Sequence, residues 1–99
     1  MRRTVPVITM LVVLAAACRE NKAIAAARGN SVEYALAACE CEKLQKKKPP
    51  GDTKLCGEQM ARAERYMRIN FEMGKVSAAD RASVRKAGAE AFEKCMKEP

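Results

Sequence analysis

Five cysteines carry the most definite chemistry of this 99-residue chain, and there is no histidine beside them. Cys39 and Cys41 are two residues apart, Cys56 and Cys95 follow singly, and Cys18 lies near the N-terminus. An odd cysteine count is awkward in an oxidising compartment, since one thiol stays reactive or bonds another chain. Removing Cys18 from the count leaves an even set that can form two disulfides.

Metal binding and redox exchange are the alternative uses of Cys39 and Cys41, because a Cys-x-Cys pair can hold soft metals or exchange disulfides. The rest of the sequence weighs against both. There is no Cys-x-x-Cys, the four thiols lack paired zinc-ligand spacing, and histidine, the usual partner ligand, is missing. We expect structural disulfides, with no metal and no cofactor.

The remaining polar residues show no catalytic arrangement. The carboxylates are scattered, and without histidine the commonest general base is missing. Lys46–Lys48 could dock on an anionic partner, although a lysine run at a helix end more often complements the helix dipole and stays solvated. Met60, Met67 and Met73 could form an adaptable surface, but methionine at helical spacing more often fills a core. We expect a protein that binds and is not an enzyme.

The N-terminal segment, MRRTVPVITMLVVLAAAC, decides in which compartment the other cysteines reside. Two arginines form a basic start, an apolar run follows from Val5 to Leu14, and three alanines precede Cys18. This is the pattern of a secretory signal peptide that is cut after Ala17. A membrane-spanning helix would need roughly 20 apolar residues, which is more than this run contains.

Leu14 to Cys18, LAAAC, resembles the lipobox of bacterial lipoproteins, in which an aliphatic residue and two small residues precede a cysteine. In that family the aliphatic residue stands three before the cysteine, where this chain has Ala15. The resemblance implies that cleavage falls between Ala17 and Cys18 and that diacylglycerol and an N-acyl chain such as palmitate are added to Cys18. Each buried methylene contributes about 0.8 kcal/mol, so several acyl chains hold a protein firmly on a membrane. Ordinary secretion to the periplasm, with an unmodified Cys18, is the alternative.

Residues 18–99 are expected to form one small domain with a thin core. The chain has two Phe, two Tyr and no Trp, so the core depends on Ala, Met, Leu and Val. Domains of this size often rely on disulfides. Loss of the two N-terminal arginines lowers the formal net charge from +7 to about +5. This mild excess suits anionic lipid headgroups or envelope polymers, and it equally serves solubility.

The first part of the mature chain is rich in alanine and is predicted to be helical. Residues 19–28 fit a short helix or fraying tether that Gly29 ends, because glycine suits a left-handed C-terminal cap. Asn30 and Glu33 have capping-box spacing, which predicts a second helix from there to about residue 47. The chain is thereby divided into a signal peptide at 1–17, an anchored tether at 18–29 and a helical module at 30–99.

Two further helices follow a proline-rich turn. Pro-Pro-Gly at 49–51 ends the preceding helix, and Asp52 or Thr53 can cap a third helix that runs to about residue 73. Ser77 opens the next capping box, which starts the last helix. No strand pattern of period two and no internal repeat occurs in the sequence. The predicted fold is all-α, a small three-helix up-down bundle with disulfides, preceded by the signal peptide and the short helical tether.

Each of the last two helices carries one apolar face, with members three and four residues apart. These members are Cys56, Met60, Ala63, Met67, Phe71 and Gly74 in the third helix, and Val84, Ala87, Gly88, Ala91, Phe92 and Cys95 in the last. We expect both faces to pack into a common core.

The positions of the cysteines relative to the turns predict how they pair. Cys41 and Cys56 lie within about 4.5 Å of the same level across the first turn, at 1.5 Å of rise per residue. Cys56 and Cys95 are about equally far from the second turn, so all four gather at one end of the bundle. Cys39 and Cys41 point away from each other on one helix, which disfavours a bond between them. We favour Cys41 with Cys56 and Cys39 with Cys95, narrowly over the exchanged pairing.

Val32-Glu33-Tyr34, Cys41, Pro50-Gly51 and Cys56 together resemble the pattern of small entry-exclusion lipoproteins of conjugative elements. This resemblance covers about a quarter of the chain. It implies an envelope protein that blocks redundant DNA transfer by contacting transfer machinery. The last helix and its cysteine lie outside the shared pattern.

The favoured function is that of a membrane-anchored, non-enzymatic interaction module in a bacterial cell envelope, on the periplasmic face of a membrane. Its expected partners are the membrane, through Cys18, and an envelope protein or anionic envelope polymer, with no nucleic acid. The main alternative is an exported metal-binding or redox protein that uses Cys39 and Cys41. A lysozyme-inhibitor-like binder is a third candidate, which the positive charge disfavours because such partners are themselves basic.

Overall fold

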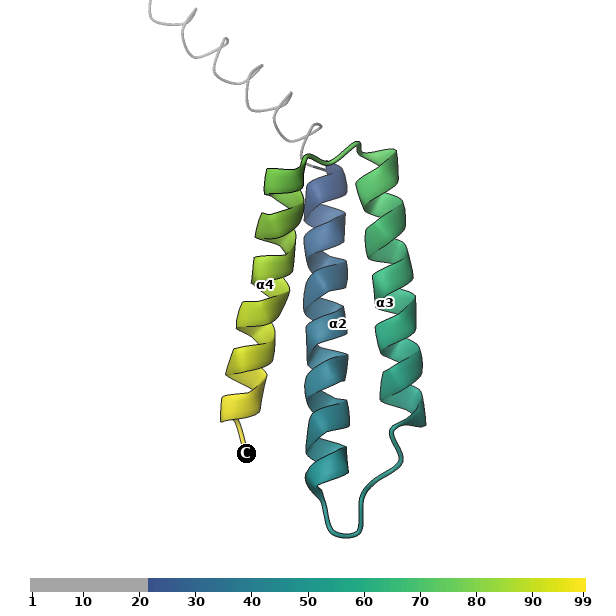
Figure 1. Cartoon of the computed structure of the whole chain (residues 1–99), viewed down its shortest axis with the longest axis vertical. Helices are drawn as coiled ribbons and strands as arrows, with labels where there is room; N and C mark the ends of the chain where they lie inside the picture. The colour runs from purple at the N-terminus through teal and green to yellow at the C-terminus, as the bar shows by residue number, and fades with distance from the viewer. Residues whose placement is uncertain (1–21) are drawn as a thin grey trace, which may run out of the picture.

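Three helices account for most of residues 22–99, the part of the chain that the computed structural model describes (Figure 1). α2 spans Lys22–Lys46, α3 spans Lys54–Met73 and α4 spans Ala78–Lys97. This part contains no strand, and none of its helices is long and apolar enough to cross a membrane. The predicted all-α class is confirmed for these residues. The predicted signal peptide at 1–17 lies outside them.

α2 is the central helix, and both other helices pack against it (Figure 1). α3 runs antiparallel to α2 on one side, and α4 runs parallel to α2 on the other. The backbones of α3 and α4 scarcely approach each other, so these two helices meet mainly through long side chains. The chain direction alternates as an up-down bundle requires, with the first of the three helices in the middle.

α2 is one continuous helix through Gly29, so the predicted helix end at Gly29 and the predicted start at Asn30 are wrong. Gly29 does not adopt a left-handed conformation, and a glycine inside a helix costs about 1 kcal/mol relative to alanine. Two tertiary interactions offset this cost. Ala27 is fully buried in the core, and the Asn30 side chain accepts a 2.8 Å hydrogen bond from Asn70 Nδ2. Residues 22–29 therefore belong to the bundle and are not a tether.

The turn between α2 and α3 forms at the predicted Pro-Pro-Gly sequence. The Gly51 backbone nitrogen donates to the Leu44 carbonyl oxygen at 2.9 Å, which closes the turn. The Asp52 carboxylate accepts from the Lys54 backbone nitrogen at 2.9 Å. Thr53 occupies the N-cap position but makes no side-chain cap bond. Of the two capping candidates, Asp52 is therefore the one whose side chain satisfies a backbone donor of α3.

The turn between α3 and α4 is short and is closed at both ends. The Gly74 backbone nitrogen donates to the Asn70 carbonyl oxygen at 3.0 Å, and Gly74 itself is right-handed. Lys75 is the residue with positive φ, at 47°. Ser77 caps α4 as predicted, because its Oγ accepts from the Asp80 backbone nitrogen at 3.2 Å.

The apolar core lies at the end of the bundle that holds the α3–α4 turn. Its buried members are Ala27, Met67, Phe71, Val76 and Val84, with Ile24 packed against them. Two arginines of α4 cover the Phe71 ring, with guanidinium carbons 5.2 Å (Arg81) and 5.8 Å (Arg85) from its centroid. A cation over an aromatic face contributes about 0.5–1 kcal/mol at an exposed site. Side chains of α3 and α4 therefore meet at this end although their backbones do not.

α2 and α4 come close together where Gly88 meets Ser31. Both residues are buried. A Cβ at position 88 would lie only 2.8 Å from the Ser31 carbonyl oxygen and closer still to the Ser31 hydroxyl. Glycine is the one residue that fits this contact, so its missing side chain sets the distance between α2 and α4.

Candidate functional site

The four cysteines of the described residues form two disulfides, in the pairing favoured from the sequence. Cys39 of α2 is bonded to Cys95 of α4, with 6.2 Å between their Cα atoms. Cys41 of α2 is bonded to Cys56 of α3, with 5.7 Å between their Cα atoms. Both bonds lie in the half of the bundle away from the α3–α4 turn. The predicted lipid-attachment residue, Cys18, lies outside the described residues.

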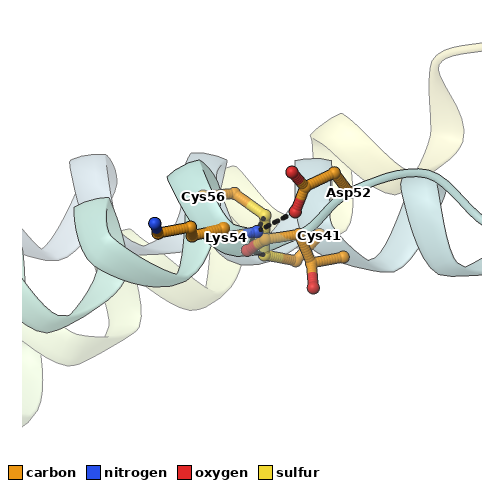
Figure 2. Close-up of a disulfide and its surroundings, with 5 residues drawn as sticks. Cys41, Asp52, Lys54 and Cys56 are labelled. Atoms are coloured by element: carbon orange, nitrogen blue, oxygen red, sulfur yellow. Dashed lines mark hydrogen bonds between the residues drawn. A yellow bond between two sulfur atoms is a disulfide. The ribbon is translucent and has the colours of Figure 1, made fainter.

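Figure 2 shows the Cys41–Cys56 bond at the start of α3. The hydrogen bond from the Lys54 backbone nitrogen to Asp52 holds the first turn of α3 beside this disulfide. The Thr53 carbonyl oxygen lies 3.2 Å from Cys56 Sγ and 3.8 Å from Cys41 Sγ. Bonded sulfurs carry no proton to donate, so these are packing contacts. The disulfide thus fills the space between α2 and the turn that leads into α3.

The two disulfides are poorly placed for metal or redox chemistry. Cys39 is fully buried and Cys56 is 3 % exposed, while their partners Cys95 and Cys41 are half-buried, so each bond offers an attacking thiol only one partly exposed cysteine. Cys39 and Cys41, the pair that a soft-metal site would use, are bonded to different helices. Within residues 22–99, no group of three or more histidine, cysteine or carboxylate side chains could hold a metal ion. The geometry favours a structural role for both bonds.

A groove runs between α3 and α4, with α2 as its floor. It forms because both outer helices pack on α2 while their backbones stay apart. Its volume is about 500 Å³. Tyr34, Ala35 and Ala38 of α2 line the floor, and Met67 of α3 and Phe92 of α4 line the walls. Ala35 and Ala38 keep this part of the floor low between two larger apolar walls, beside the bulkier Tyr34.

An ion pair crosses the rim of this groove. Glu64 of α3 and Arg85 of α4 lie 4.0 Å apart, and both line the groove. Arg85 also lies over the Phe71 ring, so two neighbours orient its side chain. An apolar lining with a few polar groups at the edge is typical of binding sites for apolar side chains or small ligands.

The lysine run lies at the other end of α2, close to the disulfides. Lys46 is 4.0 Å from Glu42 one turn earlier, and both side chains are exposed. An exposed pair of this kind contributes at most about 1 kcal/mol. Lys47 and Lys48 are exposed as well, so the run is solvated and accessible to an anionic partner.

Two features of the helix faces differ from the sequence-based expectations. The contact of Gly88 with Ser31 was not predicted, although a glycine in the middle of an expected apolar face is a signal of close helix packing. The methionines of α3 also differ from one another in burial. Met67 fills the core as expected, whereas Met73 is exposed at the end of α3.

No family model matches this chain, and no curated protein or solved structure is similar enough to count as a match.

Proposed function

We propose that this chain is a bacterial envelope lipoprotein, anchored through Cys18, that acts as a non-enzymatic interaction module. The pairing of the cysteines carries the proposal. Four of the five cysteines are bonded to one another, and two disulfides in so small a helical domain are typical of an exported protein. The fifth, Cys18, directly follows the signal-like segment, at the position that is acylated in lipoproteins.

The short distance along the chain between Cys18 and the start of α2 supports attachment close to the membrane. Only residues 19–21 separate Cys18 from Lys22, where α2 is already helical. An extended chain spans at most about 3.6 Å per residue, so about 14 Å is the upper limit between the two Cα atoms. The bundle would therefore work at the membrane surface, where its positive charge favours anionic headgroups.

The groove between α3 and α4 is the proposed contact site for a protein partner in the envelope. Its walls are fixed, because one disulfide ties each outer helix to α2. A preformed groove binds with less loss of conformational entropy than a flexible surface does. A partner that inserts an apolar side chain between Met67 and Phe92 fits this lining, and an anionic polymer would instead use Lys46–Lys48.

The alternatives have less support from the described residues. A metal or redox role for Cys39 and Cys41 needs accessible thiols, whereas both sulfurs are bonded and Cys39 is fully buried. An entry-exclusion role is a narrower form of the same proposal, because it names transfer machinery as the partner. It rests on the sequence resemblance alone.

Intact mass of the protein from the membrane fraction, with and without reduction, tests the proposal. We expect loss of residues 1–17, acyl mass on Cys18, and a gain of about 4 Da on reduction, from two hydrogen atoms per disulfide. A Cys18→Ser variant is the control, and it should lack acyl mass and leave the membrane fraction. Retention of Met1, or a water-soluble wild-type protein without acyl mass, would refute the anchor.

A further inference from the structure

Three exposed apolar side chains lie in one line on α3, outside the face that packs against α2. Tyr66 is 51 %, Ile69 is 41 % and Met73 is 80 % exposed, and their spacing of three and four residues aligns them on the helix. Arg62, also exposed, continues the line one turn earlier. We call Arg62, Tyr66, Ile69 and Met73 the outer α3 stripe; Leu55, 68 % exposed, lies on the same line two turns before Arg62 and beyond the stripe. The core-facing Met67 lies on a different side of the helix.

We propose that the outer α3 stripe pairs with the same stripe of a second copy of this chain, antiparallel about a two-fold axis. Its spacing of four, three and four residues reads the same in both directions, so it is compatible with a two-fold contact between identical surfaces. With the axis at the middle of the stripe, Tyr66 lies opposite the partner's Ile69. Arg62 lies opposite the partner's Met73, which its aliphatic stem can cover.

Charges beside the stripe select the antiparallel arrangement. Arg65 and Glu72 flank it on one side, both are exposed, and neither takes part in an ion pair within residues 22–99. In the antiparallel register, Arg65 lies within about 3 Å of the level of the partner's Glu72, twice per dimer. A parallel register would place Arg62 against Arg62 of the second copy, where like charges repel.

The rest of the bundle leaves room for this pairing. α4 approaches α3 at Phe71 and Glu64, which lie on the side of α3 away from the stripe. At the end of the stripe, Gly74 lies directly against Ala23 of α2. The starts of the two α2 helices would therefore be about 20 Å apart along the α3 axis. The lipid anchors of both copies could then reach one membrane. This consequence rests on the proposed function, whereas the pairing of the two stripes does not.

The contact is short, which sets its strength. The stripe extends over about 16 Å of helix from Arg62 to Met73. Such a contact lies at the low end of specific protein interfaces, so we expect a dimer of micromolar or weaker affinity.

Photo-cross-linking of the full chain in bacterial cells tests the pairing, with p-benzoylphenylalanine in place of Tyr66. We expect a covalent homodimer whose linked peptide maps to residues around the partner's Ile69. The same group in place of Lys86, which is exposed on α4, is the control and should give no homodimer. Thermal unfolding and the disulfide content of each variant confirm that its fold is unchanged.

A charge swap makes the test specific. Arg65→Glu should weaken the dimer about tenfold, because both cross-copy ion pairs become repulsive. Adding Glu72→Arg should restore the dimer, since the exchanged pair reproduces the same contacts. With the photo-reactive group in place of Met73 instead, cross-links between the two copies of residue 73 would overturn the antiparallel arrangement, which keeps them about 16 Å apart along the helix axis. Cross-links only to lipid or to other proteins, or a monomer throughout, would overturn the pairing of the two copies.

Discussion

Replacing Gly88 with alanine tests the close contact between α2 and α4, and the same replacement at Gly29 is its matched control. Both glycines lie inside helices, so alanine gains about 1 kcal/mol of helix propensity at either position. Their surroundings differ. A Cβ at position 88 would lie 2.8 Å from the Ser31 carbonyl oxygen, whereas a Cβ at position 29 would meet no atom of another element within 4 Å.

The expected changes in the free energy of unfolding have opposite signs. Overpacking a close contact costs about 1–3 kcal/mol, so Gly88→Ala should lose about 1 kcal/mol after its gain in propensity. The Ser31 carbonyl belongs to the backbone of α2, so it can yield only if α2 and α4 move apart. Gly29→Ala should gain up to about 1 kcal/mol, because nothing opposes the propensity term.

Urea unfolding with the disulfides intact, followed by far-UV circular dichroism, measures both changes. A Gly88→Ala variant as stabilised as Gly29→Ala would show that α2 and α4 are not in close contact. A destabilised Gly29→Ala variant would contradict the continuous helix through Gly29. The two outcomes are independent: Gly88→Ala tests the contact between α2 and α4, and Gly29→Ala tests the continuity of α2.

Two further changes probe the covalent and capping contributions. Replacing Cys39 and Cys95 by alanine should cost about 4 kcal/mol and replacing Cys41 and Cys56 about 3 kcal/mol, because the first bond closes 56 residues and the second 15. Urea unfolding of the two double variants measures the difference, and the reverse order would contradict the loop argument. Ser77→Ala should cost about 1 kcal/mol through loss of the α4 cap, while Ser77→Asp should retain most of the stability in the same assay.

The helix boundaries that local chemistry sets were predictable from the sequence. Pro-Pro-Gly at 49–51 cannot continue a helix, and Ser77 satisfies a backbone donor only three residues away, so neither depends on the rest of the fold. The same boundaries place all four cysteines at one end of the bundle, because helices joined by short turns run antiparallel. They leave two pairings open, since Cys39 and Cys41 both come close to the level of Cys56, and the side of α2 on which each cysteine lies decides between them.

The boundary at Gly29 and Asn30 was not predictable, because the local signal there is overruled by tertiary contacts. Asn30 has the residue type and spacing of a helix cap, yet its side-chain oxygen accepts a hydrogen bond from Asn70, forty residues later in the chain. Ala27 carries no sign in the sequence of being fully buried among residues of α3 and α4. A glycine inside a helix costs about 1 kcal/mol of helix propensity, and the burial of Ala27 together with the Asn30–Asn70 hydrogen bond can exceed this cost.

The groove was beyond sequence reasoning for a related reason. Its existence depends on α2 being central and on the separation of α3 from α4, and neither is encoded in the periodicity of a single helix. Glu64 shows the difficulty. On the sequence it is an ordinary surface carboxylate of α3, but in the fold it pairs with Arg85 across the groove.

The two ends of the bundle are held by different interactions, and this links the redox state to the proposed binding site. Apolar packing around Phe71 holds the end with the α3–α4 turn, whereas the other end has the two disulfides. The groove wall at Phe92 lies one turn before Cys95, and its floor at Ala38 directly precedes Cys39. Without the bonds, these parts of the wall and floor lose the covalent link that keeps them in register. On the proposed function the two bonds form after export to an oxidising compartment, so a reduced precursor should bind the proposed partner more weakly than the oxidised protein.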